Sequence, residues 1–563
     1  MPRVPPARAG LVREVSPRRP FGAVHGGTKA RESTAAEFRP GPPRSLPRSS
    51  IERQRRPDMP RFKGYSCLVA AALTAIALPA AAQEILRVPY ITDIGSFDPD
   101  NAFEVGALSA INNVYEGLVE YAPGTTDIVG LLAEDFSVSD DGLTYTFDIV
   151  DGATFHDGTP VNAQAVLTAL DRRGSDKMML NYFLWNVTSI TAPDDDTVVI
   201  TMGMPQPSFL DTLASPWGPK IISAKAIADH GDDPDWFIEH AVGTGPFKLT
   251  TFDRGSEYVL TKFDDYYGEK PFFDTIELPV VPDIGQQILQ LRAGDIDAIP
   301  VGYPYAQLAA LPPGLDIYSA PAMALVQAFV KPGSVLEDPE IRKAVLTAIA
   351  PDTWIGDAFA DYATPALSLY QAAMLTPEQP VAFPADMDAA KAIIEAHGGL
   401  SLTLGYGAGN TDNVGQAADL MAANLAAIGV DVQILTLPAG AVYGLKDDLD
   451  SAPDLLITRS SPDAAHPDTQ ASVFYTTGAV LNLLGASLPE ADDIVGQAFS
   501  VADKAEAAKL YEQAGHLWFD AGMYIPLADI EEVVVHAAGL TDIGTRPVFP
   551  PGNIDFGTVR WAE

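Results

Sequence analysis

The residues of this 563-residue chain that could perform chemistry do not show the spacing of a known catalytic site. The chain contains no G-x-S-x-G nucleophile elbow, no H-E-x-x-H zinc motif and no Walker A segment. Its most glycine-rich run, GYGAG at 405–409, does not have the G-x-G-x-x-G spacing of a dinucleotide-binding loop. We therefore expect no catalytic residues, no bound cofactor and no enzymatic activity.

The histidines and the single cysteine also argue against a metal site. The eight histidines do not cluster. His156 lies in a Phe-His-Asp-Gly turn and is expected to be structural, and His230 and His240 flank a polar loop that is expected to be solvated surface. Cys67 is the single cysteine and lies in a predicted signal peptide (residues 59–82), so the chain left after cleavage is expected to have no disulfide. No zinc or other metal ligands are predicted.

A protein without these groups can still bind a solute through a few polar side chains in a cleft between lobes. The segment 454–467 contains Arg459, Ser460 and Asp463, which are candidates because of the family resemblance given below. A buried carboxylate is costly unless it meets a cation, so Asp463 in a closed cleft would select an amine. Arg459 could instead pair with a carboxylate, which would suit a zwitterionic or acidic solute. The alternative is that Asp463 is an exposed loop residue.

Aromatic side chains could form the walls of such a cleft, although each is more often part of a core. The candidates are Phe97, Trp217, Tyr303, Phe329 and Tyr443.

The most informative local pattern is a hairpin followed by a helix, over residues 132–166. Apolar residues alternate with polar ones from Leu143 to Ile149, which predicts a half-buried strand. Gly142 ends the preceding Asp-Asp-Gly turn and can take a positive φ. Further Asp-Gly turns follow at 151–152 and 157–158, and a helix is predicted to begin near Asn162.

The N-terminal region indicates export. Residues 1–58 are rich in Arg, Pro and Ser and cannot form a core, so they are expected to be disordered. They are either translated upstream sequence, the interpretation we favour, or a basic nucleic-acid-binding arm. Residues 59–82 combine a basic start, an apolar run and a small-residue cleavage site, which predicts a cleaved signal peptide rather than a membrane anchor.

The mature chain is strongly acidic. Residues 1–83 hold 15 of the 36 basic and 5 of the 74 acidic residues, which leaves a net charge of −48. A surface of this charge repels nucleic acid and anionic membranes, so neither is an expected partner.

The hairpin resembles the signature of family 5 solute-binding proteins, the peptide/nickel-type receptors of bacterial ABC importers. The matching positions are Ala133-Glu134, Ser137 to Phe147, Asp151-Gly152 and Phe155 to Pro160. Five further segments are similar to family motifs: Tyr115 to Val119, Val242 to Leu249, Leu289 to Ala298, Asp338 to Val345 and Tyr524 to Leu527. The resemblance covers essentially the whole mature chain.

The resemblance implies an α/β, type II periplasmic binding fold, with two lobes joined by a hinge and an extra small domain inserted in the first lobe. The implied parts are the first lobe (84–115, 242–322 and 519–563), the small domain (116–241) and the second lobe (323–518). It also aligns Asp463 with the aspartate that pairs with a ligand's ammonium group in peptide-binding members. Three departures lie nearby: Arg459 replaces a Gly, Ser460 a Trp and Ala464 a Tyr. Val330, beside Phe329, replaces a frequent Asn.

The implied function is capture of a peptide or peptide-like solute in the periplasm by a monomeric protein, with delivery to the permease and ATPase subunits of an importer. The same fold could bind a nickel chelate, an opine or an oligosaccharide, or act as a non-transport receptor or chaperone-like protein. A secreted hydrolase is the remaining competitor.

Overall fold

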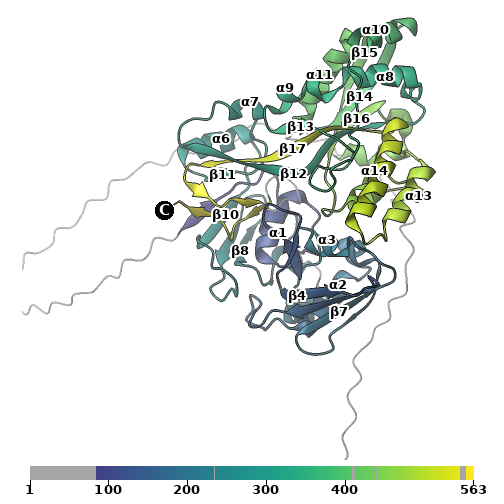
Figure 1. The fold of residues 1–563 in the computed structure, drawn as a ribbon. Helices are drawn as coiled ribbons and strands as arrows, with labels where there is room; N and C mark the ends of the chain where they lie inside the picture. The colour runs from purple at the N-terminus through teal and green to yellow at the C-terminus, as the bar shows by residue number, and fades with distance from the viewer. Residues whose placement is uncertain (1–83, 234, 409–412, 439, 546–552, 563) are drawn as a thin grey trace, which may run out of the picture. The chain divides into compact units, whose positions relative to one another are not determined.

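The computed structural model describes residues 84–233, 235–408, 413–438, 440–545 and 553–562 (Figure 1). The predicted N-terminal extension (1–58) and signal peptide (59–82) lie outside the described residues. Within the described ranges, no helix is long and apolar enough to cross a membrane.

A four-stranded sheet, called here the first-lobe sheet, has the strand order β1-β10-β9-β8. Its bounds are β1 Ile85–Arg87, β10 Thr275–Pro279, β9 Glu257–Lys262 and β8 Phe247–Asp253. The helix α1 (Leu108–Val114) shares its core cluster. All seven residues of α1 are buried, including the polar residues Ser109, Asn112 and Asn113. Its polar positions therefore mark interior contacts, not a solvated face; Asn113 donates to the Ile554 carbonyl.

The predicted hairpin forms part of a second sheet, the small-domain sheet, with the order β4-β5-β7-β6. Its bounds are β4 Ala133–Val138, β5 Thr144–Ile149, β7 Thr197–Met202 and β6 Val187–Thr191. Tyr145, Phe147 and Ile149 are buried as the alternation predicts, and Gly142 has a φ of 67°. The helix α2 (Ala163–Arg173) begins after Asn162, whose side chain accepts from the Ala165 amide. The hairpin and helix predictions are confirmed.

His156 and two glycines connect this hairpin region to the first lobe. His156 Nε2 lies 2.9 Å from the Gly245 carbonyl oxygen, and burial lowers the pKa of this imidazole to about 4, so His156 is structural. Neither Gly243 nor Gly245 has a positive φ, so these glycines are not required by a left-handed backbone. They are needed for close approach instead: a Cβ on Gly243 would lie 2.1 Å from the Val114 carbonyl oxygen.

The largest sheet, called here the second-lobe sheet, has the order β11-β17-β12-β16-β14-β15, with β13 also paired to β17. Its bounds are β11 Ala298–Ile299, β17 Tyr524–Ala537, β12 Leu315–Val330, β16 Leu455–Ser460, β14 Leu400–Gly407, β15 Val430–Leu437 and β13 Ala363–Pro365. Two core clusters cover its two faces, one with α8, α10 and α11 and the other with α13 and α14 (Figure 1). These helices span Pro339–Ala348, Met387–Ala396, Val414–Ala427, Pro489–Ala498 and Lys504–Asp520.

The two long strands β12 and β17 pair antiparallel from Leu315–Ala537 to Phe329–Tyr524 and connect different cores. Val534 of β17 belongs to the core of the first-lobe sheet, whereas Phe329 and Tyr524 belong to a second-lobe core. The pairing is interrupted between Pro321 and Leu325, where the ladder shifts register. The lobe and domain boundaries given above stay predictions.

The remaining elements connect these sheets. β2 Val119–Tyr121, β3 Ile128–Gly130 and α3 Phe209–Ala214 pack in the core cluster of the small-domain sheet. α4 Ala224–His230 and α5 Trp236–Glu239 contribute Ala226 and Phe237 to the core cluster of the first-lobe sheet. Later elements are α6 Ile284–Ala293, α7 Tyr305–Leu308, α9 Ile355–Phe359, α12 Pro467–Gln470, β18 Leu540–Thr541, β19 Gly544–Thr545, β20 Ile554–Asp555 and β21 Arg560–Trp561.

Candidate functional site

The segment that carries the polar candidates begins as a central strand and ends as a loop. Strand β16 lies between β12 and β14, and Arg459 and Ser460 are its last two residues. Asp454, just before the strand, accepts hydrogen bonds from the Thr403 amide and hydroxyl, each at 2.8 Å. The chain then crosses a short loop that contains Asp463 and enters α12. The sheet therefore fixes where the loop starts, and α12 fixes where it ends.

Asp463 contacts the small domain rather than open solvent. Tyr182 Oη donates to Asp463 Oδ2 at 2.7 Å, and Ser215 Oγ donates to the Asp463 carbonyl oxygen at 2.5 Å. Burial raises the pKa of the Asp463 carboxyl to about 6, while the hydrogen bond from Tyr182 acts in the opposite direction. The alternative of a fully exposed loop residue does not describe this partly buried side chain.

Two further aspartates lie at the same contact. Asp468 follows on α12, and Asp211 on α3 accepts from Tyr121 Oη at 3.2 Å. The same Tyr121 oxygen accepts from the Ala465 amide at 2.9 Å. Burial raises the pKa of both Asp211 and Asp468 to about 7. The contact between the small domain and residues 463–468 is therefore rich in carboxyl groups that resist ionisation.

Ser460 belongs to a buried polar network and does not line an opening. Its hydroxyl accepts from Gln327 Nε2 at 2.8 Å and from Gln470 Nε2 at 3.3 Å. Tyr475 Oη donates to Gln327 Oε1 at 2.7 Å, which closes the network. Arg459 is half-buried and faces Val326 across the β12–β16 pair.

The aromatic candidates do not gather in one place. Phe97 packs on Phe252 and Tyr258 inside the first-lobe core, and Phe329 packs edge-on against Tyr524. Four of the candidates, Phe97, Phe329, Tyr303 and Trp217, are buried in core clusters, whereas Tyr443 is 60% exposed. These five side chains lie in different clusters or on the surface, so the structure does not bring them together in one cleft wall.

Trp217 is the one aromatic candidate that lies near Asp463. Its amide donates to Ser215 Oγ at 3.1 Å, the same hydroxyl that donates to the Asp463 carbonyl. Its ring stacks on that of Phe103 with centroids 5.2 Å apart, and Phe103 is 43% exposed. The structure thus brings Asp463 and Trp217 together through Ser215.

Sequence reasoning missed Tyr182, Ser215 and Tyr121. Each lies more than two hundred residues from its partner in the 463–465 loop. No local pattern marks these residues, because a tyrosine or serine with this role looks like any other polar or amphipathic residue. Only knowledge of how the small domain meets the loop could have identified them.

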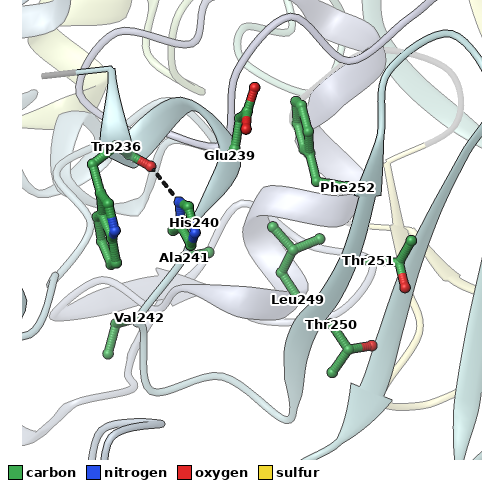
Figure 2. A pocket seen from close by; sticks show the side chains of 9 residues that line it. All are labelled: Trp236, Glu239, His240, Ala241, Val242, Leu249, Thr250, Thr251 and Phe252. Carbon is green, nitrogen blue, oxygen red and sulfur yellow. Dashed lines mark hydrogen bonds between the residues drawn. The ribbon is translucent and has the colours of Figure 1, made fainter.

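A surface pocket of about 340 Å³ lies elsewhere, between α5 and β8, and contains none of the candidates (Figure 2). Figure 2 shows Trp236 and Phe252 on its walls, with His240 Nδ1 2.9 Å from the Trp236 carbonyl oxygen. His230 and His240 stack on opposite faces of Trp236, with ring centroids 3.9 and 4.5 Å away. Within the described ranges, no group of three or more His, Cys, Asp or Glu side chains could hold a metal ion.

The comparison that decides the family is a sequence model. The model for bacterial extracellular solute-binding proteins, family 5 (middle), matches residues 127–482. The chain belongs to this family. The matched range contains the hairpin, the small-domain partners Tyr182 and Ser215, and the loop with Asp463.

Individual family 5 members agree with this assignment. The glutathione-binding protein GsiB of Escherichia coli O1:K1 / APEC is 28% identical over 496 residues, which cover 85% of this chain and 95% of that protein. The periplasmic binding protein DppA from Helicobacter pylori, solved with the peptide STSA, has a TM-score of 0.71 at 23% identity. NikA from Brucella suis, solved with Fe(III)-EDTA, has a TM-score of 0.75 at 21% identity. In both comparisons the matched region covers 85% of this chain and 99% of the other chain.

These likenesses confirm the predicted fold, an α/β type II periplasmic binding fold with two lobes. The bonds of Asp463 to Tyr182 and Ser215 join residues that lie 281 and 248 positions apart in the sequence.

Proposed function

We propose that this protein captures a peptide-like solute with a free amino group and delivers it to the permease of an ABC importer. The observation that carries the proposal is the carboxyl of Asp463, which lies partly buried at the contact between the second lobe and the small domain with Tyr182 as its side-chain donor. The relatives support the class of solute, since GsiB binds glutathione and DppA was solved with a peptide.

The chemistry follows from the state of Asp463. A carboxylate removed from water gains most from a cation, and its neutral donor Tyr182 does not supply charge. An ammonium group at this position would form a charge-assisted hydrogen bond, which is about twice as strong as a neutral one. Because the ammonium stabilises the ionised carboxylate, solute binding lowers the pKa of Asp463 from about 6 and releases a proton near that pH.

Closure of the lobes supplies the signal to the transporter in this proposal. A solute that contacts Asp463 and the small domain together stabilises the arrangement in which the two are close. It can do so only by the difference between its affinities for the closed and open forms. Phe103, which is 43% exposed and stacks on the buried Trp217 beside Ser215, would contact the apolar part of the solute.

The wider setting is also part of the proposal. The protein is exported to the periplasm through a cleaved signal peptide, acts as a monomer, and takes no catalytic role. Hydrolysis of ATP belongs to a separate subunit of the importer.

The test uses residues 83–563 and isothermal titration with three probes: glutathione, dialanine and N-acetyl-dialanine. We expect saturable binding of glutathione or dialanine at pH 7.5 and none of the acetylated peptide, which lacks the ammonium. Asp463→Asn should weaken binding by about two hundredfold or more, because breaking a buried ion pair costs about 3–5 kcal/mol. Asp431→Asn, at an exposed position on β15, is the matched control. Equal binding of the acetylated and free peptides would overturn the proposal.

A further inference from the structure

The second lobe contains a cavity that the proposed solute contact does not use. It has a volume of about 510 Å³ and lies beside β13 and β17. Its lining comes from three stretches, residues 350–352, 364–372 and 381–383, together with Asp529 of β17. None of the small-domain residues that meet Asp463 lines it. The cavity therefore does not depend on how the small domain meets the 463–468 loop.

Most of the wall is apolar. The apolar lining side chains are Ala350, Pro351, Pro365, Ala366, Leu367, Ala372, Val381 and Phe383. The polar lining consists of Thr364, Asp352 and Asp529. A pocket of this volume with an apolar wall and few polar groups is typical of a small-molecule site.

Asp529 is the unusual member of this lining. It lies inside the sheet, on β17, paired with Leu325 of β12 on one side and Thr364 of β13 on the other. Its Oδ1 atom is buried and has no hydrogen-bond partner in the described part of the chain. A buried acceptor left unsatisfied costs about 1–3 kcal/mol, and more when it is charged. The strand pairing on both sides holds this carboxyl at the cavity.

We propose that this cavity is a binding site for a small organic cation, a primary ammonium or guanidinium group on a short apolar chain, with Asp529 as its counter-ion. The cationic head satisfies Oδ1 of Asp529, and the apolar chain packs against Phe383, Val381 and the two prolines. The site is separate from the solute contact at Asp463.

Protonation of Asp529 competes with the cation. Burial raises the pKa of this carboxyl to about 7, so it is largely ionised at pH 8 and largely protonated at pH 6. An alkylammonium group, like that of lysine, stays charged at both pH values. The other titratable groups that face Asp529 are Asp352, in the cavity lining, and the phenol of Tyr475, whose pKa the carboxylate of Asp529 raises. Cation affinity should therefore rise about tenfold from pH 6 to pH 8.

The experiment titrates residues 83–563 with n-butylammonium and n-butylguanidinium chloride at pH 6 and pH 8, with 1-butanol as the neutral isostere. Binding is followed by isothermal titration and by ligand-observed NMR. We expect saturable binding of at least one cation at pH 8, weaker binding at pH 6, and no saturable binding of 1-butanol.

Four variants separate the possible outcomes. Asp529→Asn should lower cation affinity tenfold or more, and Leu367→Trp should lower it by filling the cavity without removing charge. Asp431→Asn, at an exposed position outside the cavity lining, and Asp463→Asn should leave it within twofold. Absence of cation binding by the wild-type protein at pH 8 would overturn the proposal, since Asp529 would then simply be held protonated. Equal loss in Asp529→Asn and Asp463→Asn would also overturn it, because the cation would then bind at the solute contact.

Discussion

The hairpin at 133–149 and the loop at 463–468 belong to the same protein but are stabilised in different ways. The hairpin buries an alternating row of apolar side chains, Tyr145, Phe147 and Ile149, whose partners lie mostly within the same small domain. The loop places Asp463 and Asp468 at a contact where their partners are hydroxyl groups and backbone from distant parts of the chain. Packing in the hairpin is indifferent to pH, whereas the loop contains groups whose charge changes between pH 4 and pH 8.

The two regions differ in how specific their sequence requirements are. A strand that buries one face needs only the right residue type at every second position, so many sequences satisfy it. A buried carboxyl needs a specific donor at a specific place, and loses stability when that donor is absent. The first can be recognised locally, and the second cannot.

The largest expected effect tests the hairpin side of this comparison. Phe147 is fully buried, and Phe147→Ala should lower the free energy of unfolding by about 3–5 kcal/mol through lost burial and the cavity left behind. The loss should be the same at pH 5 and pH 8. Urea denaturation at both pH values measures it. The control is Val138→Ala. Val138 lies on the paired strand β4 and is 41% exposed, so this substitution should change stability by about 0.5 kcal/mol or less.

The second prediction concerns the charge of the loop. The pKa of Asp468 is about 7 in the folded protein and about 3.9 in the unfolded chain, so its stabilising contribution is complete below pH 4 and is lost as the pH rises to about 7. At pH 8 the penalty is up to about 4 kcal/mol. Asp468→Asn removes this penalty, so the difference in unfolding free energy between variant and wild type should shift in favour of the variant as the pH rises.

Comparing the variant with the wild type at each pH cancels other titrating groups. The main one nearby is His466, whose pKa burial lowers to about 4, so that it destabilises the fold as the pH falls below about 6.5. A pH-independent difference for Asp468→Asn would show that the pKa of this carboxyl is the same in the folded and unfolded states, and would remove the contrast with the hairpin.

The third prediction tests the junction between the hairpin region and the first lobe. A Cβ at position 243 would overlap the Val114 carbonyl oxygen, so Gly243→Ala should cost about 1–3 kcal/mol through forced backbone movement. Gly496→Ala is a matched control, because position 496 lies inside α13 with open space around it. That substitution should stabilise the protein by about 0.5–1 kcal/mol. Thermal unfolding of both variants gives the comparison directly.

The features of the fold that could be predicted from the sequence are those that depend on neighbouring residues, and those that depend on distant contacts could not be predicted. The strand at 144–149, the helix after Asn162, the αL cap at Gly294 and the cap of α8 by Asp338 all follow from residue types within a few positions of each other. The complete burial of α1 did not, because Ser109 and Asn113 are satisfied by residues near the C-terminus, such as the amide and carbonyl of Ile554. The special position of Asp463 was predicted from resemblance, but its partners Tyr182 and Ser215 could not be.

The smallest expected effect tests one hydrogen bond, from Tyr182 to Asp463. Tyr182→Phe keeps the ring and removes only the hydroxyl that donates to Asp463 at 2.7 Å. A single hydrogen bond contributes about 0.5–1.5 kcal/mol net, so stability at pH 8 should fall by no more than this amount. Because the Tyr182 bond lowers the pKa of Asp463, that pKa should rise above about 6 in the variant. Carbon-detected NMR of the aspartate carboxyl groups, with Tyr443→Phe at an exposed position as the control, measures the change. An unchanged pKa would mean that Asp463 does not depend on the small domain for its charge state. The loop would then resemble the hairpin in being determined locally, and the contrast between the two regions would have to be sought in Asp468 alone.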